Sequence, residues 1–196
     1  MPTPLPPGPP VKSLRNHAVR PSAAPLVADD VLEFHAGRLV LLLATCGGAS
    51  GAISGLTKMA KLDFFVRYPD FFEVVRRGRD QAPAQRGRAV EAAMVRHHYG
   101  PWDKRYYHVL AFLEARGLIT VRKSGKSYRI TLTRPGKLAA GRLADAPAFA
   151  GLRRTMQDVN ESLGDKNGNE LKNLIYATFT EEVGRRPMGS MIESRS

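Results

Sequence analysis

Lysine and arginine side chains are the groups in this sequence best suited to do chemistry with a partner. The chain carries a formal net charge of +12, and most of it is concentrated in one stretch. Residues 96–142 contain eleven basic and two acidic residues, which gives a local charge of +9. A cationic surface attracts polyanions, and nucleic acid is the most common of them. The alternative interpretation is a solvated cationic face that keeps the protein soluble.

The residue types that catalyse reactions do not occur in patterns that would let them act together. His97 and His98 are adjacent, so on a helix they would point about 100° apart and would not readily share a metal ion. Cys46 is the only cysteine, which excludes an internal disulfide and a Cys-rich zinc site and fits a reducing cytoplasm. The glycines around Gly51 and Gly55 are not followed by the Gly-Lys-Ser/Thr of a phosphate loop. We therefore expect a non-catalytic, cytoplasmic binding protein with no metal and no cofactor.

Composition divides the chain into a central body and two tails. Residues 1–28 hold eight of the 14 prolines and no acidic residue, which predicts a disordered, Pro-rich basic tail. Residues 29–145 form the predicted main domain, residues 146–183 a C-terminal helical pair, and residues 184–196 a flexible tail. No apolar run approaches the roughly 20 residues that span a bilayer, so we expect no membrane segment.

Hydrophobic periodicity predicts helices over most of the chain. The first, Val31 to Thr45, has Asp29 or Asp30 as its cap, and Pro69 ends the second. Asp103 is the predicted cap of the helix that Gly117 stops, and Thr133 caps the next. The segment 89–99 is predicted to be helical or partly extended. The expected helices are 31–45, 56–68, 71–77, 104–116, 135–143, 148–163 and 170–179.

Two strands are predicted after Gly117. Alternating residues indicate strands at 118–122 and 128–133, and Ser124-Gly125-Lys126 supplies the turn between them. The order is therefore a helix, a strand, a basic turn, a strand and a second helix.

The segment from Val109 to Gly136, with its Gly-Leu-Ile at 117–119, resembles the recognition helix and wing of winged-helix proteins. The resemblance covers Leu56 to Leu143 and implies a fold that is mainly α with a small β-hairpin. The expected fold is a winged helix-turn-helix with an extra N-terminal helix and C-terminal helices.

In winged-helix proteins a helix enters the DNA major groove while the hairpin reaches the backbone or minor groove. The resemblance therefore implies a contact with double-stranded DNA. Many winged helices instead dock proteins, so fold alone does not decide between the two. The expected nucleic-acid-binding residues on the helix and the wing are Lys104, Arg105, His108, Arg122, Lys123, Lys126 and Arg129.

A second resemblance rests on the strings at 57–69 and 95–107. They are similar to a family of small accessory proteins encoded beside SMC- or ABC-type ATPases and an effector, in three-component anti-phage defence systems such as Lamassu. The match extends over Val31 to Met188. It implies a non-catalytic subunit that bridges the ATPase and the effector. The alternatives are a free-standing dimeric transcriptional regulator and a pure protein-docking scaffold.

A cluster of aromatic residues precedes the presumed recognition helix. Trp and Tyr are frequent interface anchors, although Trp102 could equally fill the core. Asp63 and Arg67 form an i,i+4 pair on a predicted helix, and Asp63 could instead be a partly buried partner of Arg96 or Arg105. The expected partner-binding residues are Tyr99, Trp102, Tyr107, Asp63 and Arg67.

Overall fold

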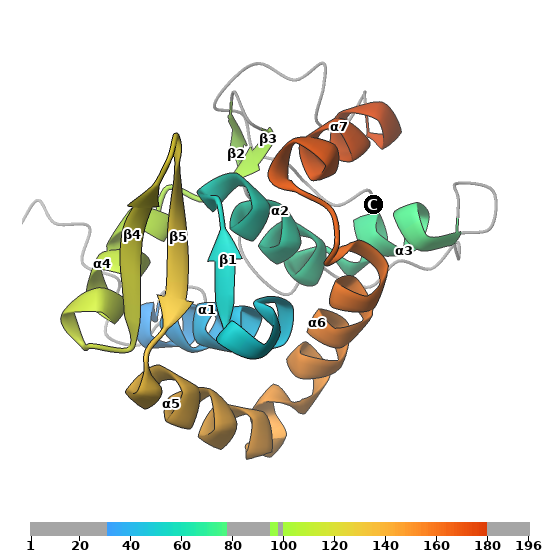
Figure 1. The fold of residues 1–196 in the computed structure, drawn as a ribbon. Helices are drawn as coiled ribbons and strands as arrows, with labels where there is room; N and C mark the ends of the chain where they lie inside the picture. The colour runs from blue at the N-terminus through green and yellow to red at the C-terminus, as the bar shows by residue number, and fades with distance from the viewer. Residues whose placement is uncertain (1–30, 78–94, 98–99, 180–196) are drawn as a thin grey trace, which may run out of the picture.

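The computed structural model describes residues 31–77, 95–97 and 100–179. The two predicted tails, 1–28 and 184–196, lie outside the described residues, as do Tyr99 and the proposed caps Asp29 and Asp30. Of the segment 89–99, only 95–97 is described, and it is a strand. The described chain is mainly helical with a small three-stranded antiparallel sheet (Figure 1).

Helix α1, Leu32–Cys46, is the central element of the core. The spacing of Leu32, Leu39, Leu42 and Leu43 predicts one buried helix face; the last three are fully buried, whereas Leu32, at the first turn, is 36% exposed. The helix starts after Val31, which provides no side-chain cap, and ends at Gly47, whose backbone N–H donates to the carbonyl of Leu43. A short 3-10 turn, η3 (Gly48–Ser50), then leads the chain into the sheet.

Helices α2, Leu56–Arg67, and α3, Pro69–Arg77, form an aromatic corner. Pro69 begins α3 as well as separating it from α2, because proline is tolerated in the first turn of a helix. The rings of Phe64 and Phe71 meet edge to face at 5.2 Å, and Phe71 also contacts Phe179 at 4.6 Å. The corner therefore ties the end of α2 to the C-terminal part of the described chain.

The larger sheet has the strand order β1-β5-β4, and neighbouring strands are antiparallel. The strands are β1 (Ala52–Ser54), β4 (Ile119–Ser124) and β5 (Ser127–Leu132). Strands β4 and β5 confirm the predicted hairpin. Strand β1 was not predicted, because three residues after a glycine-rich turn carry no periodicity of their own. A second, two-stranded sheet pairs β2 (Val95–His97) with β3 (Gly100–Trp102).

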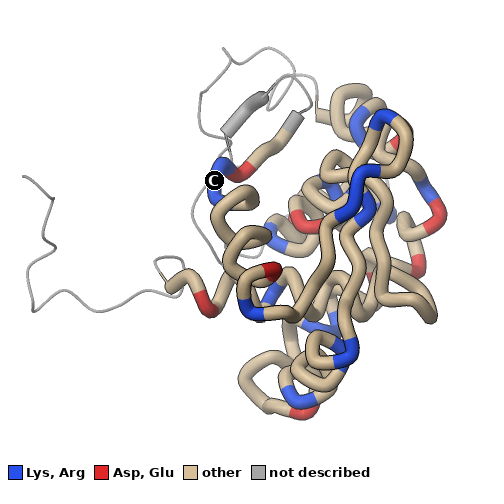
Figure 2. The backbone as a smooth tube through the Cα atoms, turned by 60° about the vertical axis from the view of Figure 1, so that its left-hand side comes forward, with Lys and Arg blue, Asp and Glu red and all other residues tan. Residues whose placement is uncertain are grey.

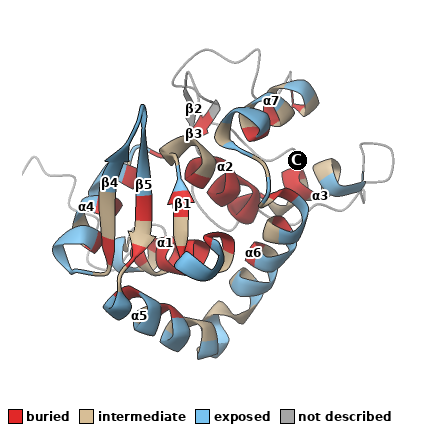
Figure 3. Ribbon diagram, viewed as in Figure 1, coloured by how far each residue is buried: buried red, intermediate tan, exposed pale blue. Residues whose placement is uncertain are grey.

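One face of the larger sheet is buried against helices. Ile53, Ile130 and Leu132 are nearly inaccessible, and α1 and α4 (Tyr106–Ala115) pack against this side. In Figure 3 the strands change from buried at their core ends to exposed at the tip of the β4–β5 hairpin. The β4–β5 hairpin, called the wing below, therefore projects beyond the core (Figure 3).

The C-terminal helices close the core. Helix α5, Arg134–Asp145, packs along α1 and is followed by a 3-10 turn, η5 (Pro147–Phe149). Helix α6, Ala150–Leu163, contacts α1 and α2, and α7, Gly168–Thr178, lies on α2 (Figure 1). Asn167 and Glu170 form a capping box at the start of α7. The predicted helical pair thus contributes buried side chains to the same core as α1 and α2.

Thr133 caps α5, as its position predicted. Its Oγ1 accepts a hydrogen bond from the backbone N–H of Gly136 at 3.1 Å and donates to the carbonyl of Gly117 at 2.6 Å. We expect T133A to lower the free energy of unfolding by about 1–2 kcal/mol in urea denaturation, since a lost N-cap costs about this much. The control is T155A, whose exposed hydroxyl bonds only within α6. An equal effect of the two variants would show that the cap contributes nothing.

Candidate nucleic-acid interface

Helix α4 lies against the core with one face and presents the other to solvent. Helical spacing predicts that Val109, Leu110 and Leu113 face inward with Tyr106 one turn earlier, and all four are buried. Gly117 has a φ of +67° and so stops the helix in the left-handed conformation that glycine favours. The helix begins at Tyr106, later than predicted, although the Asp103 carboxylate does accept the backbone N–H of Arg105 at 2.9 Å.

The predicted DNA-binding residues on this helix separate into two groups. Lys104 and His108 are exposed, as expected. Arg105 is not an outward residue: its side chain is 35% exposed, and Nη2 lies 2.7 Å from Oδ2 of Asp103. Its Nη1 also lies 2.9 Å from Nε2 of His35. The Arg105 side chain therefore contacts Asp103 and His35 within the protein. The prediction that it lies on the outer, DNA-binding face is wrong.

All four predicted cations of the wing are exposed. Ser124 pairs with Ser127, so the tip is a two-residue turn of Gly125 and Lys126, and Gly125 has a φ of +60°. Arg122, Lys123 and Arg129 lie on the strands beside this tip, and blue segments follow the hairpin in Figure 2. Because glycine adopts positive φ at little cost, the turn can close tightly and hold these cations close together.

The register of the wing assigns its cations to two faces. Residues directly opposite each other in antiparallel strands point to the same side of the sheet. Lys123 pairs with Tyr128, next to the pair of partly buried Val121 and buried Ile130, so Lys123 and Tyr128 extend the inner face of the sheet toward α4. Arg122 pairs with Arg129, which pairs on its other side with Ser54 of β1.

The charge around this surface is almost entirely positive. Residues 104–137 contain nine lysines and arginines and one acidic residue, Glu114. The Oε1 atom of Glu114 accepts the backbone N–H of Val121 at 2.8 Å, which covers part of the edge of β4. The amino end of α4 and the wing therefore form one cationic surface, defined here by Lys104, His108, Arg122, Lys123, Lys126 and Arg129.

A buried ion pair fastens α4 to the two helices behind it. Arg38 of α1 and Asp63 of α2 are 1% and 0% exposed, and Nε lies 2.8 Å from Oδ1. The hydroxyl of Tyr106 in α4 donates to Oδ2 of Asp63 at 2.7 Å. Burial and then the neighbouring Asp63 charge raise the pKa of Tyr106 well above its usual value, so the phenol stays a neutral donor. Three helices thus meet at one carboxylate.

A second carboxylate holds the segment before α4. Asp103 accepts hydrogen bonds from Nη1 of Arg67 at 2.8 Å and from Nε of Arg105 at 3.0 Å. Burial alone would raise the pKa of Asp103. The hydrogen bonds from Arg105 and the charges of Arg67 and Arg105 outweigh burial and hold that pKa well below its usual range. Asp103 is therefore ionised and anchors the start of α4.

Three of the residues predicted to bind a partner lie in the interior. Asp63, Arg67 and Trp102 are 0%, 2% and 5% exposed, so in this fold their contacts are with the protein itself. The ring of Trp102 packs edge to face on Tyr106 at 5.5 Å, which matches the core-filling alternative. Tyr107 is 60% exposed and is the member of the set that the structure places at the surface.

Lys61 is a buried cation that sequence reasoning missed. It is 0% exposed, and its Nζ donates to the carbonyl of Pro101 at 2.7 Å, near the ring of Trp102. Burial, with a smaller contribution from the charge of Lys172, lowers the pKa of Lys61 from 10.5 to about 7. The contact joins α2 to β3. The sequence does not predict it, because a lysine in a helix is usually exposed and the partner carbonyl lies 40 residues away.

The lowered pKa of Lys61 predicts a stability that depends on pH. Between pH 7 and 9 the unfolded chain holds more protons at this residue than the folded one, so the free energy of unfolding rises with pH. Above about pH 9 the buried Cys46, whose pKa burial raises from 9.0 to about 12, has the opposite effect. We expect K61M to flatten the rise between about pH 6.5 and about pH 8.5, measured as urea midpoints. An unchanged pH dependence in K61M would contradict this assignment.

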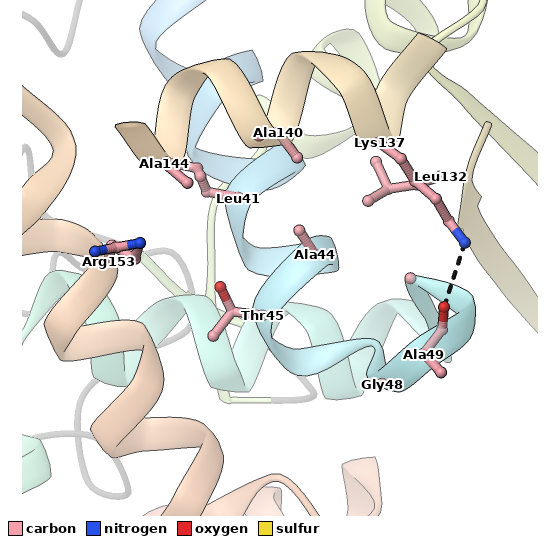
Figure 4. A pocket seen from close by; sticks show the side chains of 12 residues that line it. Leu41, Ala44, Thr45, Gly48, Ala49, Leu132, Lys137, Ala140, Ala144 and Arg153 are labelled. Carbon is pink, nitrogen blue, oxygen red and sulfur yellow. Dashed lines mark hydrogen bonds between the residues drawn. The ribbon is translucent and has the colours of Figure 1, made fainter. Parts of the chain in front are cut away.

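A shallow groove lies apart from the cationic surface. It has a volume of about 260 Å³ and is lined mainly by small residues of α1, η3 and α5, with Lys137 and Arg153 at its sides (Figure 4). Lys137 donates to the carbonyl of Ala49 at 3.3 Å, and Arg153 lies on the other side, so the two cations do not converge on one point. The groove offers no set of groups that could act together on a ligand.

The described residues contain no group of three or more His, Cys, Asp or Glu side chains arranged to hold a metal ion. None of their helices is long and apolar enough to cross a membrane.

Neither the known protein-family models, nor the curated proteins, nor the solved structures include a match to this chain.

Proposed function

We propose that this chain is a non-catalytic winged-helix protein that binds double-stranded DNA through the amino end of α4 and the wing. The observation that carries the proposal is the cationic surface, on which six exposed basic side chains gather on a helix start and a projecting hairpin. Phosphate contacts from Lys and Arg supply most of the affinity of proteins for DNA.

The order of the elements supports the winged-helix assignment. Apart from α3, β2 and β3, the chain order is helix α1, strand β1, helix α2, helix α4 and the β4–β5 hairpin. Strand β1 pairs with β5 beside α1. In this arrangement α4 is the recognition helix and the hairpin is the wing. Helix α3 and the β2–β3 pair are then an insertion between α2 and α4.

The accessory-subunit role is supported by the resemblance of the strings 57–69 and 95–107. In the structure these two strings contact each other: Lys61 bonds to Pro101, and Arg67 bonds to Asp103. The two strings thus form one internal unit that positions the start of α4. This contact gives a physical reason for both strings to be present in the same chain. We propose that the chain serves as the accessory subunit of an ATPase-centred defence complex, bridging the ATPase and the effector.

Fluorescence anisotropy of the full chain with labelled DNA duplexes, titrated with salt, tests the DNA-binding proposal. A straight decrease of log Kobs with log salt is expected, with a slope set by the number of phosphates contacted. Sedimentation in parallel separates the roles: a monomer that binds DNA fits the accessory subunit, and a dimer with a palindromic preference fits a regulator. No binding at low salt would overturn the DNA proposal and favour a protein-docking scaffold.

A further inference from the structure

The outward face of α4 carries few groups that can read bases. Its exposed residues are Tyr107, His108, Ala111, Glu114 and Ala115. Base edges in the major groove are read mostly by Arg, Lys, Asn and Gln, and none of these types occurs between Tyr106 and Ala115. The Glu114 carboxylate is occupied by the backbone of Val121 and would repel phosphates. Helix α4 can therefore occupy a groove, but it has little means of telling one base pair from another.

The wing, in contrast, carries an arrangement that suits a phosphate. Arg122, Arg129 and Ser54 lie in one register row across β4, β5 and β1, on the face of the sheet away from the core. Nη1 of Arg129 lies 3.3 Å from Oγ of Ser54, and all three side chains are exposed. Two guanidinium groups and a hydroxyl present several N–H and O–H donors in the planar geometry that phosphate oxygens accept.

The pairing of Arg122 with Arg129 is itself unfavourable in the free protein. Like charges directly opposite each other destabilise a sheet. An anion that accepts from both guanidinium groups would remove this repulsion. The inner face adds Lys123, and the tip adds Lys126, so phosphates can approach the wing from more than one side.

We infer that this interface holds duplex DNA by its phosphates and independently of base sequence, with one backbone phosphate bridging Arg122 and Arg129. The inference rests on the proposed function and adds to it the class of substrate, which is any B-form duplex. The phosphate contacts of the wing and of Lys104 then provide the affinity. Helix α4 fits the groove by its shape and contributes little base recognition.

A selection from a duplex library with a randomised central region tests sequence independence. The full chain binds the library at moderate salt, and the bound fraction is sequenced after several rounds. No enriched motif is expected, and individual duplexes should bind within about threefold of each other. A motif bound more than about tenfold tighter would overturn the inference, since one good base contact discriminates by ~1–3 kcal/mol. Absence of binding to the whole library would instead overturn the proposed function.

The double variant R122T/R129T tests the bridged phosphate. Affinity for every duplex should fall by the same factor, roughly 10- to 100-fold at about 0.1 M salt, and the salt slope should become shallower by about 1, because the two arginines share one phosphate. The melting temperature should not fall, because threonine favours strands and the repulsion is gone. R142A/R154A, which removes two exposed arginines from α5 and α6, is the matched control. Unchanged affinity in R122T/R129T, or a loss confined to some sequences, would overturn the assignment.

Discussion

The triple variant K104A/K123A/K126A is expected to bind duplex DNA about 100- to 1,000-fold more weakly than the wild type at about 0.1 M salt. Each lysine that neutralises one phosphate contributes about 0.9 to the slope of log Kobs against log salt. Three lost contacts therefore make the slope shallower by about 3. All three side chains are exposed, so the variant should fold normally. Anisotropy titrations at several salt concentrations measure both quantities.

A matched control separates the position of the charges from their number. R142A/R153A/R154A removes the same charge from exposed positions on α5 and α6, away from the wing. Charges farther than a Debye length, about 8–10 Å at these salt concentrations, are largely screened. The control should therefore bind nearly as well as the wild type. If the control and K104A/K123A/K126A lose equal affinity, net charge rather than the wing accounts for binding.

The second large effect is expected from the buried ion pair. D63A leaves the guanidinium of Arg38 uncompensated in the core, where it is 1% exposed, and leaves the hydroxyl of Tyr106 without its acceptor. Removing one partner of a buried pair costs about 3–5 kcal/mol of unfolding free energy. Urea denaturation measures this loss. E73A, which breaks only surface pairs with Arg76 and Arg77, should cost less than about 1 kcal/mol.

Two milder variants keep this prediction testable if D63A does not fold. Y106F removes one hydrogen bond to a charged acceptor and should cost about 1.5–3 kcal/mol. R38M/D63L/Y106F replaces the pair by apolar side chains and removes the hydroxyl that would lose its acceptor, so it should recover most of the stability that D63A loses. A D63A protein within about 1 kcal/mol of the wild type would show that the pair does not hold α4 in place.

Helices and the wing could be read from the sequence because their signals are local. The apolar spacing of Leu39, Leu42 and Leu43 marks the buried face of α1, and Thr133 and Gly117 mark helix ends through their own conformational preferences. The wing followed from strand alternation around Ser124-Gly125-Lys126. Strand β1 escaped prediction because what defines it is its pairing with β5, about 77 residues further along the chain.

The exposed residues of the cationic surface were predictable, whereas the internal ion pairs that hold α4 in place were not. Lys123 and Lys126 flank the hairpin turn, where few neighbours can cover them. For Arg105 the sequence shows the adjacent Asp103 but not His35, which lies 70 residues away. Asp63 was paired in expectation with Arg67, Arg96 or Arg105, whereas the structure pairs it with Arg38 of a different helix. Which charges a fold buries depends on how its helices pack, and helical spacing alone does not specify that.

Site-specific photo-crosslinking tests the central claim most directly. A benzophenone maleimide attached to K126C in the full chain should cross-link to bound duplex DNA, while the same label on R154C should not. Cys46 is 8% exposed with a raised pKa, so it reacts poorly with the reagent. The account predicts cross-links from the wing tip that disappear at high salt. Equal cross-linking from both positions, or cross-linking from R154C alone, would contradict a DNA interface formed by α4 and the wing.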